Sequence, residues 1–359
     1  MLIYGLPVAA APSVSAGSAV VYEPQTDLWL YDRAGDTPRP MASTTKLMTA
    51  LLAAERLDPN TTIQIPAGAV PVEGTQIGLA ADDRITVRDL LAGLLLASGN
   101  DCANALALWM ADTIPAFAQL MNRRAAELGM ENTCFVTPSG LDAPGHQSTA
   151  RDMALLAAAV LQNPLLAQLC ATQTQKIRIN DRSLTVRNHN KLLRLSEDCI
   201  GLKTGFTKKA GRCLVSAARR DGVTLIVITL HAPDDWNDHI TLYDYGFSRV
   251  KVCPLSQEIP TRCAVIGGTR DSVPIVAELP ASVVLRTEET LRVQVEMPRM
   301  VWAPIHTGDR VGQIIIYGNK RVLYQTPLTA TATVTARPMP SYWTLVGWRY
   351  VQLIDALLR

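Results

Sequence analysis

The hydrophobic pattern of the chain changes once, after Lys251, and this change limits the folds that its 359 residues can adopt. Before this point, Leu- and Ala-rich segments of helical period lie between strand-like segments. The helical segments are residues 45–55, 87–110, 114–128 and 149–161. Beyond it, residues 251–338 hold short β-branched segments separated by Gly, Asn and Pro, with no helical period. The sequence therefore predicts two domains, residues 17–250 and 251–338, and the chain is long enough for two.

Strand-like segments flank the helices of the first domain. Residues 19–31 are typical of a hairpin, and two apolar segments, 212–219 and 223–230, are joined across Asp221 and Gly222, a strong signal for a short hairpin. Because the helices are gathered between the strands, the pattern predicts an α+β domain with an antiparallel sheet flanked by helices. The second domain is predicted to be a small all-β sandwich.

Residues 1–16 contain no charged side chain, and the first charged residue is Glu23. The segment resembles the apolar and cleavage parts of a secretory signal, with residues 14–16 as a small-residue cleavage site, although the positively charged start of such a signal is missing. It is either a truncated signal or an apolar first strand. We favour the truncated signal, so we expect residues 1–16 to lie outside the fold and the protein to be exported.

The last segment, residues 339–359, follows a stretch punctuated by Pro338 and Pro340. Its apolar side chains recur on one face of a helix: Trp343, Leu345, Trp348, Val351, Ile354 and Leu358. The segment is too short and too charged to span a bilayer, but its Trp and Tyr residues suit an amphipathic helix at a membrane surface. The alternative is a terminal helix docked on the core of the protein itself.

Charge and composition exclude several classes of protein. There are 34 Lys and Arg against 32 Asp and Glu, a net charge of +2 with no basic tract, so no nucleic-acid partner is expected. An apolar content of 48% with only 18% charged residues excludes a disordered chain. No uncharged interior segment is long enough for a membrane-spanning helix.

The seven cysteines lie far apart, without a C-x-x-C pair. An odd number argues against a disulfide framework, although Cys253 and Cys263 could bridge neighbouring strands. Zinc sites need clustered Cys and His, and the five histidines form no such cluster, so no metal is expected.

A possible nucleophile lies at the start of the first helical segment. Ser43 and Lys46 form an S-x-x-K motif, and residues three apart share one face of a helix. In the first turn, the helix dipole favours a developing alkoxide on Ser43. Lys46 could accept the hydroxyl proton if burial and a nearby cation kept the lysine neutral. A motif this short is weak evidence alone, and a surface lysine is the ordinary alternative.

Two further motifs strengthen the interpretation. Ser98 and Asn100 form an S-x-N motif directly after a very apolar segment, and Lys203, Thr204 and Gly205 lie in a segment that is typical of a strand. S-x-x-K, S-x-N and K-T-G in this order are the active-serine signature of penicillin-recognising enzymes. The three motifs therefore predict a serine acyl-transfer site.

The similarity extends beyond the three motifs. Residues 42–49, 97–101, 139–142 with 148–152, and 201–207 resemble the serine-type D-Ala-D-Ala carboxypeptidases, which are low-molecular-mass penicillin-binding proteins. The resemblance covers residues 17–250 strongly and implies a β-lactamase/transpeptidase-like domain with a helical subdomain. The β-rich segment that follows resembles the accessory C-terminal domain of the family, and a terminal anchoring helix is also typical.

The resemblance implies a role for each motif residue. Ser43 would attack the penultimate D-Ala carbonyl and form an acyl-enzyme, Lys46 would be the base, and Ser98 would relay the proton to the departing D-Ala. Asn100 would hold the substrate amide and help to fix Lys46. The charge of Lys203 would lower the pKa of Lys46 and attract the substrate carboxylate.

The strand that follows would complete the site. The hydroxyl of Thr204 would bind the substrate carboxylate, and the oxyanion hole would use the backbone N–H of Ser43 and of a residue just after Gly205, either Phe206 or Thr207. No cofactor would be needed. The implied partners are peptidoglycan stem peptides, β-lactams as covalent inhibitors and a membrane surface, with the protein on the outer face of the cytoplasmic membrane.

Two features depart from the family pattern. Family members often place a basic residue in the loop after the second hairpin strand, but residues 223–248 contain neither Lys nor Arg. His189 lies in a loop expected to face the site, and His146 lies in a turn. Each is interpreted as a loop histidine, with a substrate contact or a place at the edge of the site as the alternative.

Two other functions remain as alternatives. A β-lactamase would need a Glu-activated water for deacylation, and no convincing Glu-x-x-x-Asn motif lies between Ser98 and Lys203. A catalytically weak penicillin-binding scaffold is opposed by the three intact motifs, but the missing loop cation keeps it open. The main hypothesis is a D-Ala-D-Ala carboxypeptidase.

Overall fold

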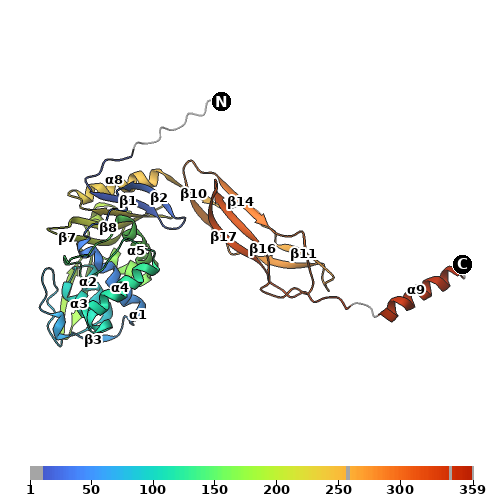
Figure 1. Cartoon of the computed structure of the whole chain (residues 1–359), viewed down its shortest axis with the longest axis horizontal. Helices are drawn as coiled ribbons and strands as arrows, with labels where there is room; N and C mark the ends of the chain where they lie inside the picture. The colour runs from blue at the N-terminus through green and yellow to red at the C-terminus, as the bar shows by residue number, and fades with distance from the viewer. Residues whose placement is uncertain (1–10, 256–258, 339–341, 358–359) are drawn as a thin grey trace, which may run out of the picture. The chain divides into compact units, whose positions relative to one another are not determined.

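The computed structural model describes residues 11–255, 259–338 and 342–357. The chain divides into two compact units, Met1–Val252 and Cys253–Arg359. Helices and an antiparallel sheet form the first unit, and strands form most of the second, which confirms the predicted α+β fold class with a β-rich second part (Figure 1).

A five-stranded antiparallel sheet is the centre of the first unit. In spatial order its strands are β2 (Leu28–Arg33), β1 (Ser18–Glu23), β9 (Val223–Leu230), β8 (Gly211–Arg220) and β7 (Cys199–Thr207). The predicted hairpins are both present, as β1–β2 and β8–β9. Asp221 and Gly222 join β8 to β9 with φ of 50° and 82°, the left-handed pair that a two-residue hairpin turn requires.

Helices cover both faces of this sheet (Figure 1). They are α1 (Lys46–Arg56), α2 (Val87–Leu95), α3 (Asn100–Ala111), α4 (Ile114–Glu127), α5 (Ala150–Gln162), α6 (Pro164–Ala171) and α8 (Asp235–Ser248). Helix α5 packs on one face and α8 on the other, while α1 to α4 form a helical group beside α5. One apolar cluster joins α1 to α6 to the sheet, and Leu47, Leu52 and Ile228 in it are fully buried. Each such side chain contributes about 1.5–3 kcal/mol on burial.

A smaller antiparallel sheet lies at the edge of the helical group. Its strands are β3 (Thr62–Gln64), β4 (Arg84–Thr86), β5 (Thr174–Ile179) and β6 (Arg182–Arg187). A short helix, α7 (Leu192–Leu195), follows β6, and two 3-10 turns, η1 (Ala42–Thr45) and η2 (Ala67–Ala69), complete the unit.

The helix expected over residues 87–110 is wrong, because the structure has two helices there. The first, α2, ends at Leu95, and α3 begins at Asn100. Ser98 has a left-handed φ of 61°, which ends the helical path although the Leu/Ala pattern continues through the break. Beyond the break, the backbone N–H of Asn100 donates to the carbonyl of Thr75 at 2.7 Å.

Residues 14–16 belong to the first unit, which corrects the expectation that they lie outside the fold. Val14 is 5% exposed and Ala16 is fully buried. The carboxylate of Asp238 accepts hydrogen bonds from the backbone N–H and hydroxyl of Ser15 and from the N–H of Ala16, at 2.8–3.1 Å. The apolar composition of residues 14–16 does not indicate these hydrogen bonds, because Asp238 is more than 200 residues away in the sequence. Residues 1–10 lie outside the described part, so their predicted role is not addressed by the structure.

The second unit is built from a six-stranded sheet and a two-stranded sheet. In spatial order the larger sheet holds β14 (Leu291–Glu296), β16 (Arg310–Gly318), β17 (Arg321–Ala330), β12 (Ser272–Val276), β11 (Arg262–Ile266) and β15 (Met300–Trp302), and the smaller holds β10 (Val250–Pro254) and β13 (Ser282–Arg286). Alternating residues such as Val273, Ile314 and Leu328 form its apolar core. All seven cysteines are free thiols, so Cys253 and Cys263 do not pair.

The chain ends with α9 (Tyr342–Leu357), as the sequence predicts. Trp348, Val351 and Ile354 of the apolar face are exposed. The side chains of Trp343, Leu345 and Leu358, which the prediction also names, lie outside the described residues. Within the part of the chain that the structure describes, no single helix has the length and apolarity needed to cross a membrane; α5 and α6 meet that test only as a pair bent by 104°.

Candidate active site

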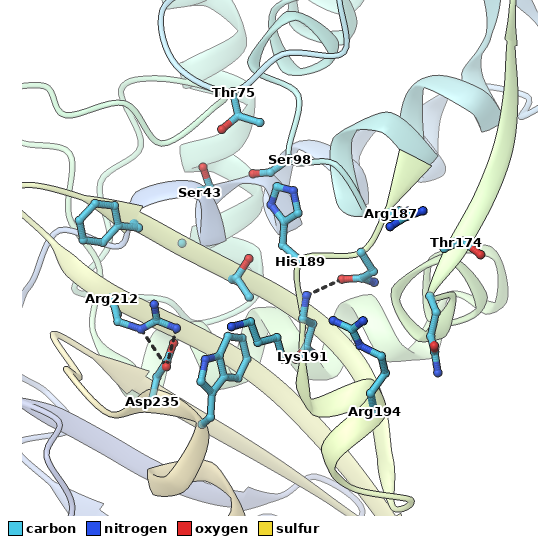
Figure 2. Close-up of a pocket in the computed structure, with 17 residues that line it drawn as sticks. Ser43, Thr75, Ser98, Thr174, Arg187, His189, Lys191, Arg194, Arg212 and Asp235 are labelled. Carbon is cyan, nitrogen blue, oxygen red and sulfur yellow. Dashed lines mark hydrogen bonds and ion pairs between the residues drawn. The ribbon is translucent and has the colours of Figure 1, made fainter. Parts of the chain in front are cut away.

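A cleft of about 640 Å³ opens beside β7 in the first unit. Its wall includes Ser43 from η1, Ser98 from the break between α2 and α3, and Thr204 to Phe206 from β7. Figure 2 shows the side chains of Ser43 and Ser98 next to each other, with His189 beside them. Three segments that are distant in the sequence therefore meet at one cleft.

Ser43 lies in the turn that leads into α1. The carbonyl of Met41 accepts hydrogen bonds from the backbone N–H and the hydroxyl of Thr44, at 3.3 and 2.6 Å, and these bonds close the turn. Because α1 begins at Lys46, the lysine lies one turn beyond the serine. The Nζ of Lys46 is 2.8 Å from the Oγ of Ser43. The predicted nucleophile and base are in hydrogen-bond contact.

Lys46 is fully buried, and its Nζ donates a hydrogen bond to the carbonyl of Ser139 at 2.7 Å. Burial, and then the charge of Lys203, hold the pKa of Lys46 well below its ordinary value. A neutral amine keeps one lone pair. With one N–H directed at Ser139, that lone pair is available to accept the hydroxyl proton of Ser43.

The S-x-N motif lies at the break between the two helices. Ser98 is nearly buried and lines the cleft beside Ser43. The Nδ2 of Asn100 donates to the carbonyl of Glu73 at 2.6 Å, and Asn100 is not among the residues that line the cleft. Its contacts with substrate and with Lys46 therefore stay predictions, and in this structure its amide is engaged by the loop before Thr75.

Lys203 lies inside the fold behind the cleft. It is only 1% exposed, and its Nζ donates to the carbonyl of Thr204 at 2.9 Å. Burial lowers the pKa of Lys203 to about 7. Its neighbour Thr204 lines the cleft. Lys203 is therefore placed behind the cleft wall, while Thr204 is placed to touch a ligand.

Gly205 allows β7 to lie against the turn that holds Ser43. A Cβ at Gly205 would be 3.0 Å from the backbone nitrogen of Ser43, so a larger residue would push the strand away. Phe206 lines the cleft and is 65% exposed. Thr207 is not among the lining residues, and its hydroxyl donates to the carboxylate of Asp142 at 3.1 Å. Of the two alternative oxyanion donors, Phe206 is the one at the cleft.

The loop of residues 137–146 supports the site from behind, a role that the sequence analysis did not assign. Gly140 has a left-handed φ of 86°, and a Cβ there would lie 1.9 Å from the carbonyl oxygen of Ala42. This close approach places the carbonyl of Ser139 on Lys46. The signal in the sequence was the Ser-Gly pair at 139–140, but Lys46, which the carbonyl of Ser139 contacts, is 93 residues away.

His146 is buried in the same region, at the edge of the site rather than in a solvated turn. Its Nδ1 accepts the backbone N–H of Val136 at 2.9 Å, so the proton is on Nε2, which donates to the hydroxyl of Thr45 at 2.9 Å. Burial lowers the pKa of His146 to about 4. His146 therefore holds the residue between Ser43 and Lys46 in place as a neutral imidazole.

A cation does reach the cleft, from a place that the sequence analysis did not consider. Arg212 of β8 lines it together with Asp235 and Trp236 at the start of α8 (Figure 2). The Nε and a terminal nitrogen of Arg212 donate to one carboxylate oxygen of Asp235 at 2.9 and 2.7 Å. The guanidinium also lies 5.3 Å from the centre of the Trp236 ring. Arg212 is thus held in place with donors left over.

His189 lines the cleft, which supports its alternative as a substrate contact. Burial, and then the charges of Lys203 and Lys46, lower the pKa of His189, so it is neutral near pH 7. Among the described residues, no group of three or more His, Cys, Asp or Glu side chains lies close enough to hold a metal ion. A serine next to a buried lysine, further hydroxyls and cations lie at the cleft, and these are the groups that serine acyl transfer requires.

Comparisons with known protein families match nearly the whole chain. Residues 7–234 match the D-alanyl-D-alanine carboxypeptidase family. Residues 247–336 match the C-terminal domain of penicillin-binding protein 5. The first match lies in the first unit, and the second covers the strands of the second unit but not α9.

Curated relatives are similar over most of their length. The D-alanyl-D-alanine carboxypeptidase DacF of Bacillus subtilis is 30% identical over 329 residues, which cover 88% of this chain and 85% of that protein. The D-alanyl-D-alanine carboxypeptidase DacB2 of Mycobacterium tuberculosis is 34% identical over 245 residues, covering 66% and 84%. A D-alanyl-D-alanine endopeptidase of Escherichia coli is 35% identical over 212 residues, covering 58% and 68%.

Solved structures show the same fold. Penicillin-binding protein 5 of Haemophilus influenzae matches with a TM-score of 0.74 and 24% identity, over 91% of this chain and 99% of the other. A mutant of the Streptomyces K15 DD-transpeptidase matches with a TM-score of 0.61 and 33% identity, over 66% of this chain and 100% of the other.

Proposed function

Because the chain belongs to the D-alanyl-D-alanine carboxypeptidase family and is a carboxypeptidase of this class, we propose that Ser43 is the nucleophile that cleaves the terminal D-Ala from peptidoglycan stem peptides. The observation that carries this proposal is the 2.8 Å contact between Ser43 Oγ and the buried Nζ of Lys46. A serine needs a neighbouring base to become nucleophilic, and a lysine is such a base only when neutral.

Acylation follows from this geometry. Oγ of Ser43 attacks the carbonyl carbon of the penultimate D-Ala, and Lys46 takes the hydroxyl proton. The oxyanion is stabilised by the backbone N–H of Ser43 and of Phe206, donors typically worth about 3 kcal/mol each. Ser98 passes the proton to the nitrogen of the leaving D-Ala as the peptide bond breaks. Water then attacks the ester, and the shortened peptide leaves with a new carboxylate.

Recognition of the substrate carboxylate is assigned to three residues. Thr204 donates its hydroxyl from the cleft wall, Lys203 contributes charge from behind it, and Arg212 provides the cation that the loop after β9 lacks. Asp235 leaves Arg212 with free N–H groups, because its two bonds to Arg212 use only two of the five N–H donors of the guanidinium. The rigid anchoring of Arg212 reduces the entropy lost when it binds a carboxylate.

The same serine is proposed to react with β-lactams, which place a strained carbonyl and a carboxylate in one small molecule. The experiment is labelling with a fluorescent penicillin, beside Ser43→Ala and beside the control Ser183→Ala, which alters an exposed serine outside the cleft. We expect a lasting band in the wild type and control, none in Ser43→Ala, and D-Ala release from a Lys-D-Ala-D-Ala peptide. Loss of the band within seconds would indicate a β-lactamase instead. No band in any protein would favour the scaffold.

Export and attachment to the outer face of the cytoplasmic membrane are also proposed. Trp348, Val351 and Ile354 recur at intervals of three on α9 and are 72%, 67% and 48% exposed. This spacing suits a helix that lies in a membrane surface. Replacing the three by Asp should abolish sedimentation of the full chain with anionic lipid vesicles, and sedimentation at the wild-type level would contradict the proposal.

The packing of residues 14–16 bears on the leader. Cleavage after Ala16 would remove the bonds of Ser15 and Ala16 to Asp238. We therefore expect any leader to be removed before Val14. N-terminal sequencing of the exported protein tests this expectation, and a mature protein that starts at Gly17 would contradict it.

A further inference from the structure

Three cations of one segment line the same cleft as Ser43. Arg187 ends β6, Lys191 directly precedes α7, and Arg194 lies within α7. All three are exposed. We call this set, Arg187, Lys191 and Arg194, the basic arm. Figure 2 draws it on the side of His189 away from Ser43.

The basic arm has no acidic partner within the described residues. Some other exposed arginines of this unit are paired: Arg182 with Asp83 at 3.0 Å, and Arg178 with Asp181 at 3.5 Å. For the side chains of the basic arm, the described part of the chain shows neither an ion pair nor a hydrogen bond. Unpaired cations are thus gathered at the cleft.

The rest of the cleft does not balance this charge. Asp235 is the single acidic residue that the described part contributes to the cleft wall, and both of its close contacts go to Arg212. Polar side chains such as Gln173 and Thr174 fill the remainder of the wall beside the basic arm. A concave surface with one sign of charge concentrates the field and attracts ions of the opposite sign.

The basic arm and the carboxylate subsite are different places in the cleft. The subsite assigned above uses Thr204 and Arg212, which lie on adjacent strands of the large sheet. The basic arm comes from the segment between the small sheet and α7. The terminal carboxylate of a substrate can occupy only one of these places, so the cations of the other stay available to a second anion.

We propose that the basic arm binds carboxylates of the substrate peptide other than its terminal one, so that the enzyme prefers acidic stem peptides with free carboxyl groups to amidated ones. This inference rests on the proposed function. It concerns the choice among peptides, and the reaction at Ser43 does not depend on it. Attraction of this kind raises kcat/KM chiefly through binding and weakens as salt is added.

The experiment compares two pentapeptides that differ only in charge. Both end in D-Ala-D-Ala; in one the Glu and diaminopimelate side carboxyls are free, and in the other they are amidated. D-Ala release gives kcat/KM for each at low and high ionic strength. Wild type should favour the acidic peptide, and the preference should shrink with salt.

The test variant is Arg187→Gln/Lys191→Gln/Arg194→Gln. Its ratio of acidic to amidated kcat/KM should fall about tenfold, since each exposed pair contributes a factor of about 1.5 to 5. The control, Arg56→Gln/Arg123→Gln/Lys176→Gln, removes the same charge from exposed residues outside the cleft. It should keep the wild-type ratio. Replacing the two arginines by Lys should keep most of the wild-type ratio, because the positive charge remains. If the guanidinium groups had a purely structural role, this variant would lose the ratio.

The outcomes separate this inference from the function on which it rests. An unchanged ratio in the test variant, or an equal fall in the control, would overturn the inference while D-Ala release persists. Release of D-Ala from neither peptide by the wild type would overturn the proposed function itself.

Discussion

Gly140 offers a sharp test of how the site is held together. At Gly140→Ala the new Cβ would lie 1.9 Å from the carbonyl oxygen of Ala42, whereas real Cβ atoms keep about 3.0 Å from such atoms. The loop or the turn must therefore move by roughly 1 Å. That movement separates Ser139 from Lys46 or displaces Ser43, and a misplacement of about 1 Å costs on the order of 100-fold in rate.

The control is a second glycine of the same loop. Gly145 also has a left-handed φ, 79°, but a Cβ there would meet nothing within 4 Å. Gly145→Ala should cost only the left-handed backbone penalty of about 1 kcal/mol. Gly140→Ala adds the clash and should cost about 3 kcal/mol of unfolding free energy.

The assay is the second-order rate of acylation by a fluorescent penicillin, with urea unfolding of each variant measured alongside. We expect Gly140→Ala to fold and to acylate about 100-fold more slowly, with Gly145→Ala near the wild-type rate. A folded Gly140→Ala that acylates at the wild-type rate would refute this reasoning. Equal losses in both variants would refute it as well.

The pKa of Lys46 is depressed by burial and then by the charge of Lys203, so Lys203→Met should raise this pKa and move the acid limb of the acylation pH profile to higher pH, as pre-steady-state labelling would show. Burial holds the pKa of Lys203 at about 7, so the unfolded chain binds more protons than the folded chain between pH 7 and 10.5. The unfolding free energy of the wild type in urea should therefore rise over that window. Lys203→Met should lose this rise and gain about 1–2 kcal/mol of unfolding free energy at pH 7. His146, with a pKa of about 4, should cause stability to fall as pH drops from 6.5 to 4, and His146→Ala should remove that dependence and slow acylation about tenfold. Arg212→Gln should raise KM for a D-Ala-D-Ala peptide about tenfold, and an unchanged KM would show that another group binds the carboxylate.

The parts of the site that the sequence predicts are those whose chemistry is local. Ser43 and Lys46 share a helix turn, and Lys203 and Thr204 share a strand, so residue type and spacing are sufficient to identify them. Gly140, His146 and Arg212 were not assigned their roles, because each depends on a contact between distant segments. For example, 93 residues separate Lys46 from Ser139.

The parts of the fold that the sequence predicts are likewise those with local signals. Hairpins and helices followed from periodicity and from turn residues such as Asp221 and Gly222. The single helix over 87–110 was wrong because the apolar period continues across the break, while the left-handed backbone at Ser98 is a tertiary feature. Residues 14–16 were misplaced for a related reason: their composition suggests a leader, but Asp238 on α8 holds them.

The assembly of the site from distant segments also makes acylation a measure of folding. Ser43, Ser98 and Lys203 meet only when η1, the break after α2 and β7 are packed together, so a chain that lacks any of these contacts has no reactive serine. The amount of β-lactam label formed at each urea concentration therefore measures the fraction of native molecules. The covalent label remains after denaturation, which allows the native fraction of the first unit to be read on a gel even within a crude extract.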